Sequence, residues 1–366
     1  MSINNDSELI LFADRFIVIA ISGNMSSDIS NSTNSITSAP LLNRVKFGVF
    51  LSLQIPSVIC SVYLFFQYAT RQYLRQSIHN HAIIVLLCNG FSFMVIPLSA
   101  NQAYFFTSRV RPESNLFCAV WTWVHYSLDI SNLILMAFVC AERHWLIFRI
   151  NAMPTRWKRL VCHYIPIGLC MIYPWLFYFA CIFLHPCEPA YDYTQLLCLI
   201  PCYFFTKSVA NLDTFLNNWV PIFAIPLLSG ALFVRFLAQK RRMRIDQFRW
   251  KRDRRMIIQL LSITLLYCLT WGPLQAATVY NNFFNDGMAS PFVVDYLYSF
   301  PCFVYLLYPF VLLLSNPELQ WRSRRVQPQE NLELRPTLNT NKWNCFDIDL
   351  LSSCLVLFVV AFLVIL

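Results

Sequence analysis

The chain has 366 residues, of which 57% are hydrophobic and only 13% are charged, and its formal net charge at pH 7 is +9. About a quarter of the residues of a soluble domain are charged, and a globule of this length cannot bury so much apolar surface, so a soluble protein is excluded. We predict an all-α membrane protein that crosses the bilayer several times. Membrane lipids are its expected surroundings, and nucleic acid is not an expected partner.

The N-terminal segment, residues 1–44, precedes the first long apolar run. It contains acceptor triplets for N-glycosylation, of which those at Asn24 and Asn31 are the candidates. The stretch 8–22 is apolar but lacks a basic start and is interrupted by charged residues, so it does not read as a signal peptide. We expect this segment to be extracellular.

The main domain, residues 45–315, contains seven apolar runs that are long enough to cross a bilayer as helices. The runs do not alternate polar and apolar residues, which argues against membrane-spanning strands. A seven-helix transmembrane bundle is therefore predicted. The predicted spans are residues 45–69, 82–105, 116–141, 160–184, 211–237, 256–280 and 292–315.

The positive charges predict how the bundle is oriented. If the N-terminus lies outside, all but six of the 28 Lys and Arg residues fall on the inner side. Positive residues accumulate in cytoplasmic loops, so we predict a multi-pass plasma-membrane protein with its N-terminus outside and its C-terminus inside. The six exceptions are Arg15, Arg44, Lys46, Arg109, Arg111 and Lys207.

Four of the 14 cysteines fall on the predicted outer side, where disulfides form. They are Cys118, Cys187, Cys198 and Cys202, and four cysteines allow three pairings. The chain has neither zinc-ligand spacing nor a catalytic or phosphate-binding motif, so we predict no metal, no cofactor and no enzymatic activity.

The third span carries a polar stripe. Cys118 and Arg143 are 25 residues apart, close to seven helical turns, so they lie on one face at opposite ends of the helix. Glu142 and Arg143 form an acid–base pair at the inner end. The residues between the two ends on this face are Thr122, His125, Asp129, Asn132, Met136 and Val139.

This arrangement resembles the rhodopsin-like (family 1, class A) G-protein-coupled receptors. That family has seven helices, a cysteine at the outer start of the third helix, and an Asp/Glu-Arg-Tyr triplet at its inner end. The triplet here reads Glu142-Arg143-His144. The resemblance covers roughly residues 45–325 and implies that Cys118 is joined to the loop 185–208. Cys198 is its implied partner, with Cys187 and Cys202 bonded to each other.

A second motif lies in the sixth span, where Trp271-Gly272-Pro273 is similar to the Cys-Trp-x-Pro motif of the same family. A proline inside a helix produces a kink. The resemblance implies that Trp271 responds to the bound ligand. It also implies that Asp253, at the inner end of this span, pairs with Arg143 and ties the third and sixth helices together.

The seventh span departs from the family pattern. The family's Asn-Pro-x-x-Tyr is represented only by Pro309, because Tyr308 replaces the asparagine and Leu312 the tyrosine. In the second span Asn89-Gly90 occupies the place of the family's sodium-binding aspartate. The chain is therefore identified as a divergent member.

The C-terminal region has three predicted parts. The resemblance implies that residues 316–325 form a short amphipathic helix on the membrane surface. Residues 326–349 read as a cytoplasmic linker. The apolar tail, residues 350–366, is either an eighth span or a translated extension without a structural role.

The candidate ligand site lies in the outer half of the bundle. A carboxylate such as Asp129 is costly inside a membrane and usually functional, so we expect it to anchor a cationic or polar ligand group; a hydrogen-bonded structural acid is the alternative. In the family's amine receptors the anchoring aspartate aligns with His125, so an amine held in the usual way is not expected. The resemblance adds Trp271, Gln275 and Tyr298 as candidate contacts.

The predicted function is a receptor that transmits the binding of a small-molecule or peptide ligand to a heterotrimeric G protein. The alternative is a transporter or channel of seven or eight spans, which would favour internal repeats or several charges at mid-membrane. The sequence shows no repeat, and Asp129 reads as the lone intramembrane acid. A receptor relic without signalling is a third hypothesis.

Overall fold

The computed structural model describes residues 32–72, 74, 78–148, 156–242, 247–284 and 297–315, and at some segment ends only their backbone. The candidate glycosylation sites Asn24 and Asn31 lie outside the described residues. The same holds for the three predicted C-terminal parts, 316–325, 326–349 and 350–366. The backbone at Asp253 is described, but its side chain is not.

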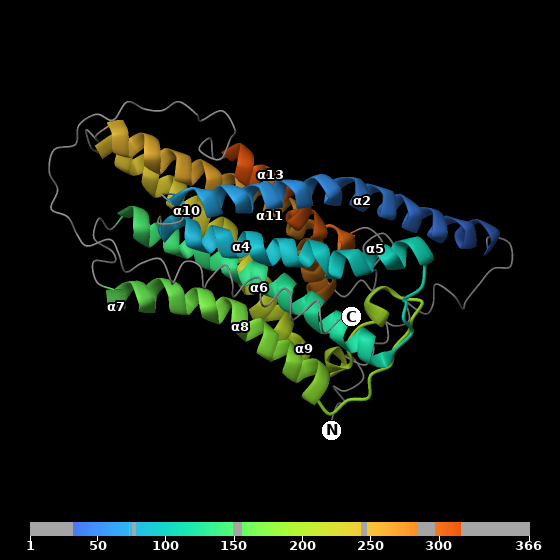
Figure 1. The fold of residues 1–366 in the computed structure, drawn as a ribbon. Helices are drawn as coiled ribbons and strands as arrows, with labels where there is room; N and C mark the ends of the chain where they lie inside the picture. The colour runs from blue at the N-terminus through green and yellow to red at the C-terminus, as the bar shows by residue number, and fades with distance from the viewer. Residues whose placement is uncertain are drawn as a thin grey trace, which may run out of the picture.

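The described part of the chain is helical, and its helices lie side by side (Figure 1). The first half contains α2 (Ser32–Thr70), α4 (Ile78–Val95), α5 (Pro97–Thr107), α6 (Asn115–Phe148), α7 (Arg156–Arg159), η1 (Leu160–Tyr164), α8 (Ile165–Phe179) and η2 (Ala180–Leu184). The second half contains η3 (Leu196–Cys198), η4 (Cys202–Phe205), α9 (Lys207–Leu212), η5 (Asp213–Trp219), α10 (Val220–Arg242), α11 (Gln247–Phe284), η6 (Leu297–Ser299) and α13 (Cys302–Ser315).

Six stretches of helix are long and apolar enough to cross a membrane, and they agree with the first six predicted spans to within a few residues. The described bounds of these stretches are Leu41–Thr70, Asn80–Thr107, Asn115–His144, Arg156–Leu184, Lys207–Ala238 and Ile257–Tyr280. A helix satisfies most of its backbone hydrogen bonds internally, as a lipid environment demands.

The predicted seventh span, 292–315, is longer than the helix found there. The described helix α13 has 14 residues and begins at Cys302, directly after Pro301. Proline is favoured at a helix start, because its missing N–H would have no partner there. The turn η6 precedes α13, and residues 292–296 lie outside the described part. A short apolar helix therefore occupies the place of the seventh span.

Two local features shape the long helices. The second span breaks at Ile96, where α4 ends and α5 begins with Pro97, whose ring disfavours a continuous helix through the residue before it. The fourth and fifth spans contain π-helical turns, η1 and η2 in one and η5 in the other. Such turns are common at functional sites because they redirect side chains.

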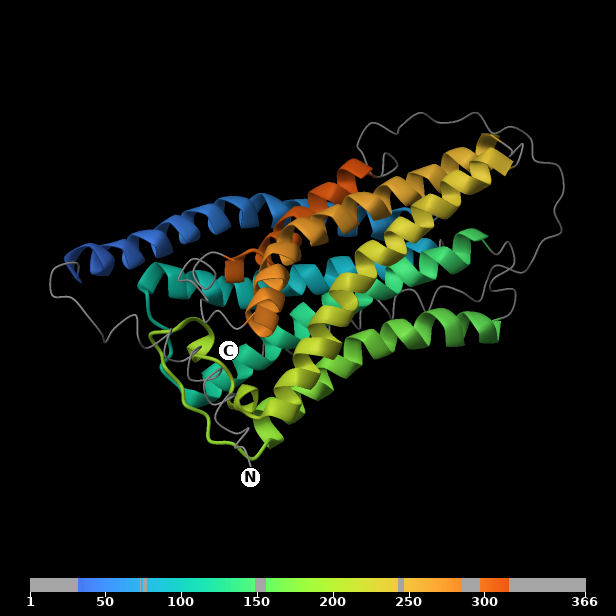
Figure 2. The same cartoon turned by 180° about the vertical axis from the view of Figure 1, so that it is seen from behind.

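Helix α6 lies at the centre of the bundle and packs against α4, α5, α8 and α10. Helix α13 packs against α2, α4 and α11, and Figure 2 shows α10 and α11 side by side on the other face. We call the end that holds Cys118 and the loop 185–206 the disulfide end. We call the opposite end, which holds residues 142–144, the triplet end.

Burial separates the inner from the outer helices. In the second span 78% of the most apolar window is buried, whereas in the fourth span only 22% is. The exposed face of α8 is made of large apolar side chains, including Leu169, Ile172 and Leu176. A surface of this kind suits lipid rather than water.

Candidate functional site

The polar stripe of α6 is buried, and its residues are hydrogen-bonded to three other parts of the chain. The Thr122 hydroxyl donates to the backbone oxygen of Leu197 in the loop at 3.3 Å. The carboxylate of Asp129 accepts a hydrogen bond from the Tyr305 hydroxyl of α13, and the Asn132 amide oxygen accepts one from Tyr267 of α11. Buried polar groups are normally paired in this way. The stripe therefore connects α6 to the loop, α13 and α11.

Tyr305 fits into a space that the neighbouring helix leaves open. Its ring stacks on Phe93 with the centroids 3.9 Å apart. A Cβ atom added at Gly90 of α4 would lie 3.5 Å from the ring of Tyr305 and 4.0 Å from the amide nitrogen of Asn132. The absent side chain at Gly90 therefore gives room to the aromatic ring that donates to Asp129.

The candidate ligand-site residues are brought together only in part. His125 is 7% exposed and lies edge-on to Phe93 at a centroid distance of 5.1 Å. Among the described residues, its Nδ1 atom has no hydrogen-bond partner. The hydroxyls of Tyr126 and Tyr298 are 3.1 Å apart, which connects α6 to η6.

Two further candidates lie on α11. Trp271 and Gln275 are one turn apart and both are buried, at 3% and 7% exposure. Pro273 lies between them inside the helix, and because it lacks an N–H it cannot complete the backbone ladder at this point. The turn below is reinforced by the Thr270 hydroxyl, which donates to the Leu266 oxygen at 2.8 Å.

The structure contains a second buried acid within a span, so Asp129 is not the lone intramembrane acid that the sequence indicated. Asp213 of η5 is 1% exposed. It accepts hydrogen bonds from Tyr178 of α8 at 2.7 Å, from Tyr203 of the loop at 2.9 Å and from Asn217 at 2.8 Å. The four-residue spacing of Asp213 and Asn217 places both on one helix face and is the sequence signal for this pair.

Tyr203 is held as a hydrogen-bond donor. Its side chain is fully buried in the loop between the fourth and fifth spans. Burial and the neighbouring Asp213 carboxylate raise the pKa of Tyr203 well above its ordinary value. The phenol therefore keeps its proton and donates to Asp213 at neutral pH.

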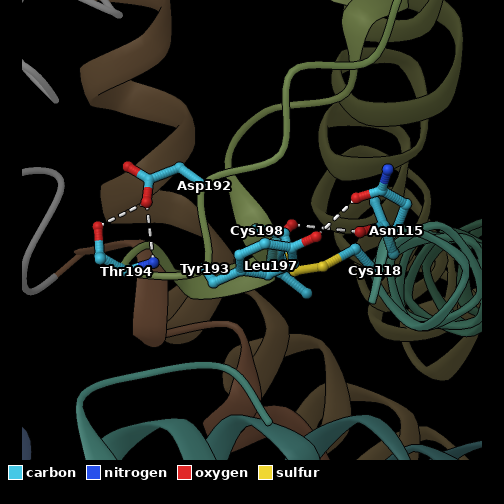
Figure 3. Close-up of a disulfide and its surroundings, with 8 residues drawn as sticks. Asn115, Cys118, Asp192, Tyr193, Thr194, Leu197 and Cys198 are labelled. Atoms are coloured by element: carbon cyan, nitrogen blue, oxygen red, sulfur yellow. Dashed lines mark hydrogen bonds between the residues drawn. A yellow bond between two sulfur atoms is a disulfide. The ribbon is translucent and has the colours of Figure 1, made fainter. Parts of the chain in front are cut away.

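The loop 185–206 closes the disulfide end. Cys118 is joined to Cys198 and Cys187 to Cys202, the pairing that the resemblance implied. Figure 3 shows the first disulfide and, beside it, the hydroxyl of Tyr193 directed at Asn115 of α6, a bond of 2.6 Å. A native disulfide of this kind stabilises a fold by about 2–4 kcal/mol.

The backbone near this disulfide is unusual. Leu197, Cys198 and Leu199 have φ angles of 57°, 57° and 83°, a region that costs non-glycine residues about 1 kcal/mol or more each. Such conformations persist only where the surroundings impose them. Here Leu197 is 3% exposed and packs with Val110 and Trp121.

The space beneath the loop is small. A cavity of about 20 Å³ is lined by Ala119 and Thr122 of α6, by Ile182, and by loop residues on both sides of Cys198. A volume near 10–15 Å³ is needed to hold one water molecule. The cavity therefore has room for about one water and not for an organic ligand in this conformation.

The described side chains at the triplet end join α6 to η1 and α10. Glu142 is bonded to Nδ1 of His163, which lies on the π-helical turn η1. The other ring nitrogen of His163 is 3.3 Å from Nδ1 of His81 on α4. Arg143 is 4% exposed, and the predicted pair with Asp253 involves a side chain outside the described set. His144 is bonded to the Leu228 oxygen of α10 at 2.6 Å.

The seventh helix, α13, is also bonded to α4. Pro309 lies inside α13 and is buried. Tyr308, the residue before it, donates to the backbone oxygen of Ile83 on α4 at 3.3 Å. The tyrosine in place of the family's asparagine therefore fastens α13 to α4.

Comparison with known proteins supports the fold. No protein-family model and no curated protein sequence matches the chain. Among solved structures, squid rhodopsin matches with a TM-score of 0.57 over 75% of this chain and 83% of the squid chain, at 17% sequence identity. A likeness at this identity establishes the fold alone. The chain has a rhodopsin-like fold, and the predicted resemblance is confirmed at that level.

Proposed function

We propose that the chain is a divergent rhodopsin-like receptor that couples an extracellular ligand to a heterotrimeric G protein in the plasma membrane. The observation that carries the proposal is the occurrence of Glu142-Arg143-His144 at one end of the central helix of a rhodopsin-like fold, with the Cys118 disulfide at the other. The two ends are the parts that such a receptor uses for its partner and its ligand.

The arrangement of α6 supports a signalling role. Its polar stripe is bonded to α11 through Asn132 and to α13 through Asp129. A change in the outer half of the bundle therefore reaches three helices through direct hydrogen bonds. A ligand can shift such a bundle between two packings only if it binds one of them better.

The ligand contacts that we propose lie below the loop. His125 offers an unpaired ring nitrogen among the described residues, Asp129 a carboxylate, and Trp271 and Gln275 a buried surface on α11 next to Pro273. Tyr298 closes the site on the side of η6 through its contact with Tyr126. Because the cavity beneath the loop is small, ligand entry requires these groups to separate.

At the triplet end we propose that Arg143 contacts the G protein when α11 moves outward, with Asp253 as its partner in the resting state. Glu142 then remains with His163 in both states, since that pair ties α6 to η1 rather than to α11. Pro273 and Pro309 supply the points at which α11 and α13 bend.

The test is nucleotide exchange by purified G proteins reconstituted with the full chain in lipid nanodiscs. Ligand-independent exchange is measured first, since no ligand has to be known. We expect Arg143→Ala to abolish the exchange, and Arg109→Ala to leave it unchanged, because Arg109 is an exposed cation at the disulfide end, paired with Glu113. If nucleotide exchange does not depend on Arg143, or if the chain conducts ions and promotes no exchange, the receptor assignment is wrong.

A further inference from the structure

The loop 185–206 is fastened to the bundle at two separate places. Its first half is tied to α6 through the Cys118–Cys198 disulfide and the Tyr193–Asn115 bond. Its second half, residues 199–206, reaches the bundle core through Tyr203, which is fully buried. The first attachment belongs to the proposed receptor, whereas the second has no role in it so far.

Asp213 is the acceptor for this second attachment. Its carboxylate receives donors from three elements: Tyr178 of α8, Tyr203 of η4 and Asn217 of η5. All three donors are neutral, so an ionised Asp213 depends on these hydrogen bonds for its stability. Withdrawing the loop donor from a fully buried carboxylate is costly, which keeps Tyr203 in place.

The second disulfide determines where Tyr203 lies. Cys202 is bonded to Cys187 and immediately precedes Tyr203 in the chain. The disulfide therefore fixes the residue next to the tyrosine. The Tyr203 ring also stacks on that of Phe204, with the centroids 4.5 Å apart.

Both halves of the loop line the cavity above the polar stripe. The second half contributes Leu199, Ile200 and Pro201, which lie opposite Thr122 of α6. Releasing 199–206 would open the cavity outward without breaking the Cys118–Cys198 bond. The loop can therefore open by its second half alone.

We propose that residues 199–206 form a lid and that Tyr203, presented by the Cys187–Cys202 disulfide, is the latch that closes it by donating to Asp213. Tyr203 is a positioning residue and need not touch the ligand. The part of this inference that concerns ligand entry rests on the proposed receptor function. The latch itself is measured on the protein without any G protein.

The first experiment is hydrogen–deuterium exchange of the full chain in nanodiscs. In Tyr203→Phe we expect the amides of 203–206 to exchange about tenfold faster, because closure loses a hydrogen bond to a charged group. The matched control is Tyr193→Phe, which removes a loop hydroxyl bond at the rim and should leave 203–206 unchanged. Equal protection of these amides in the native chain and Tyr203→Phe would overturn the latch.

Two more variants keep the result independent of folding defects. Asp213→Asn should give the same rise in exchange as Tyr203→Phe, and the double variant no further rise. Cys187→Ser/Cys202→Ser should loosen 203–206 while 191–198 stays protected by the Cys118–Cys198 disulfide. If 203–206 is unaffected by loss of this disulfide, the disulfide does not present the tyrosine.

Access to the cavity is measured with a thiol probe. Thr122→Cys places a thiol on the cavity wall, and its reaction with a small charged methanethiosulfonate is compared with the background of the native cysteines. When Tyr203→Phe is added to Thr122→Cys, we expect the thiol to react about tenfold faster, whereas adding Tyr193→Phe should leave the rate unchanged. Equal rates for Thr122→Cys with and without Tyr203→Phe would overturn the lid, whatever the outcome of the nucleotide-exchange test.

Discussion

At the scale of single residues, the described part of the bundle contains three buried carboxylates, and each accepts a hydrogen bond from another segment. Asp129 is bonded to α13, Asp213 to α8 and the loop, and Glu142 to η1. Ionised groups within a membrane protein are costly unless paired, and they usually have a function. Each of the three thus fastens one helix to a neighbour at a defined depth.

The Glu142–His163 pair should dominate the stability of the triplet end. Both side chains are nearly inaccessible, at 2% and 0% exposure. We expect His163→Phe to lower the free energy of unfolding by about 3 kcal/mol, because it leaves a buried carboxylate without its partner. The measurement is the unfolding midpoint of the purified protein in nanodiscs.

The control for this prediction is the double variant Glu142→Gln/His163→Phe. Because it removes the carboxylate together with its histidine partner, it should be more stable than the sum of the two single changes predicts. Simple additivity of the two changes would show that the side chains do not interact.

Tyr305 and Tyr308 offer a matched comparison on α13. Tyr305→Phe removes the donor to the Asp129 carboxylate and should cost about 2 kcal/mol, whereas Tyr308→Phe removes a bond to a backbone oxygen and should cost about 1 kcal/mol or less. Unfolding midpoints of the two variants, measured side by side, check the order. A larger loss of stability in Tyr308→Phe than in Tyr305→Phe would contradict this prediction.

At the scale of helices, α4, α6 and α13 meet at Gly90, a residue without a side chain. A Cβ atom added there would lie at ordinary contact distance from the ring of Tyr305 and the amide of Asn132, so a small residue fits and a larger one does not. Small residues at helix interfaces let membrane helices approach closely. The bond from Tyr305 to Asp129 is available because α13 lies this near to α4.

This packing gives a prediction for Gly90. We expect Gly90→Ala to change stability by less than about 1 kcal/mol, since the added carbon meets only van der Waals contacts. Gly90→Leu should cost about 2 kcal/mol, because the larger side chain displaces Tyr305 from Asp129. The control is Gly168→Leu on α8, where nothing lies within 4 Å of the added carbon. Equal losses at the two positions would contradict the close-packing argument.

At the scale of the whole molecule, the sequence predicted the elements better than their contacts. Hydropathy placed six spans to within a few residues, and the Cys118-to-Arg143 spacing placed the two ends of α6. The Tyr305–Asp129 bond joins residues 176 positions apart, and the Tyr178–Asp213 bond residues 35 apart. No local pattern encodes which side chains meet across helices, because the packing of the whole bundle decides it.

The described part of the seventh span is less regular than hydropathy predicts. Hydropathy alone does not show that the turn η6 comes first and that α13 begins at Cys302, directly after Pro301. A proline inside a membrane helix is tolerated when neighbours compensate, and Pro273 and Pro309 lie inside α11 and α13. The same residue type therefore precedes one helix and lies inside two others.

The orientation of the molecule joins the charge pattern to the fold. Both disulfides lie at one end of the bundle, and α7, with three cations in four residues, lies at the other (Figure 1). Disulfides persist on the oxidising side of a membrane, while Lys and Arg accumulate on the cytoplasmic side. Both arguments favour the predicted orientation, and we propose that the disulfide end lies outside and the triplet end on the cytoplasmic side.

Two epitopes test this orientation, one placed at the N-terminus and the other inserted between α10 and α11. We expect antibodies to label the first epitope on intact cells and the second only after permeabilisation, because α10 ends and α11 begins at the triplet end. Asn24→Gln and Asn31→Gln together should also remove any mass shift produced by an endoglycosidase. Labelling of the α10–α11 epitope on intact cells would place Arg143 outside, where no G protein can reach it, and the receptor proposal would fail with the orientation.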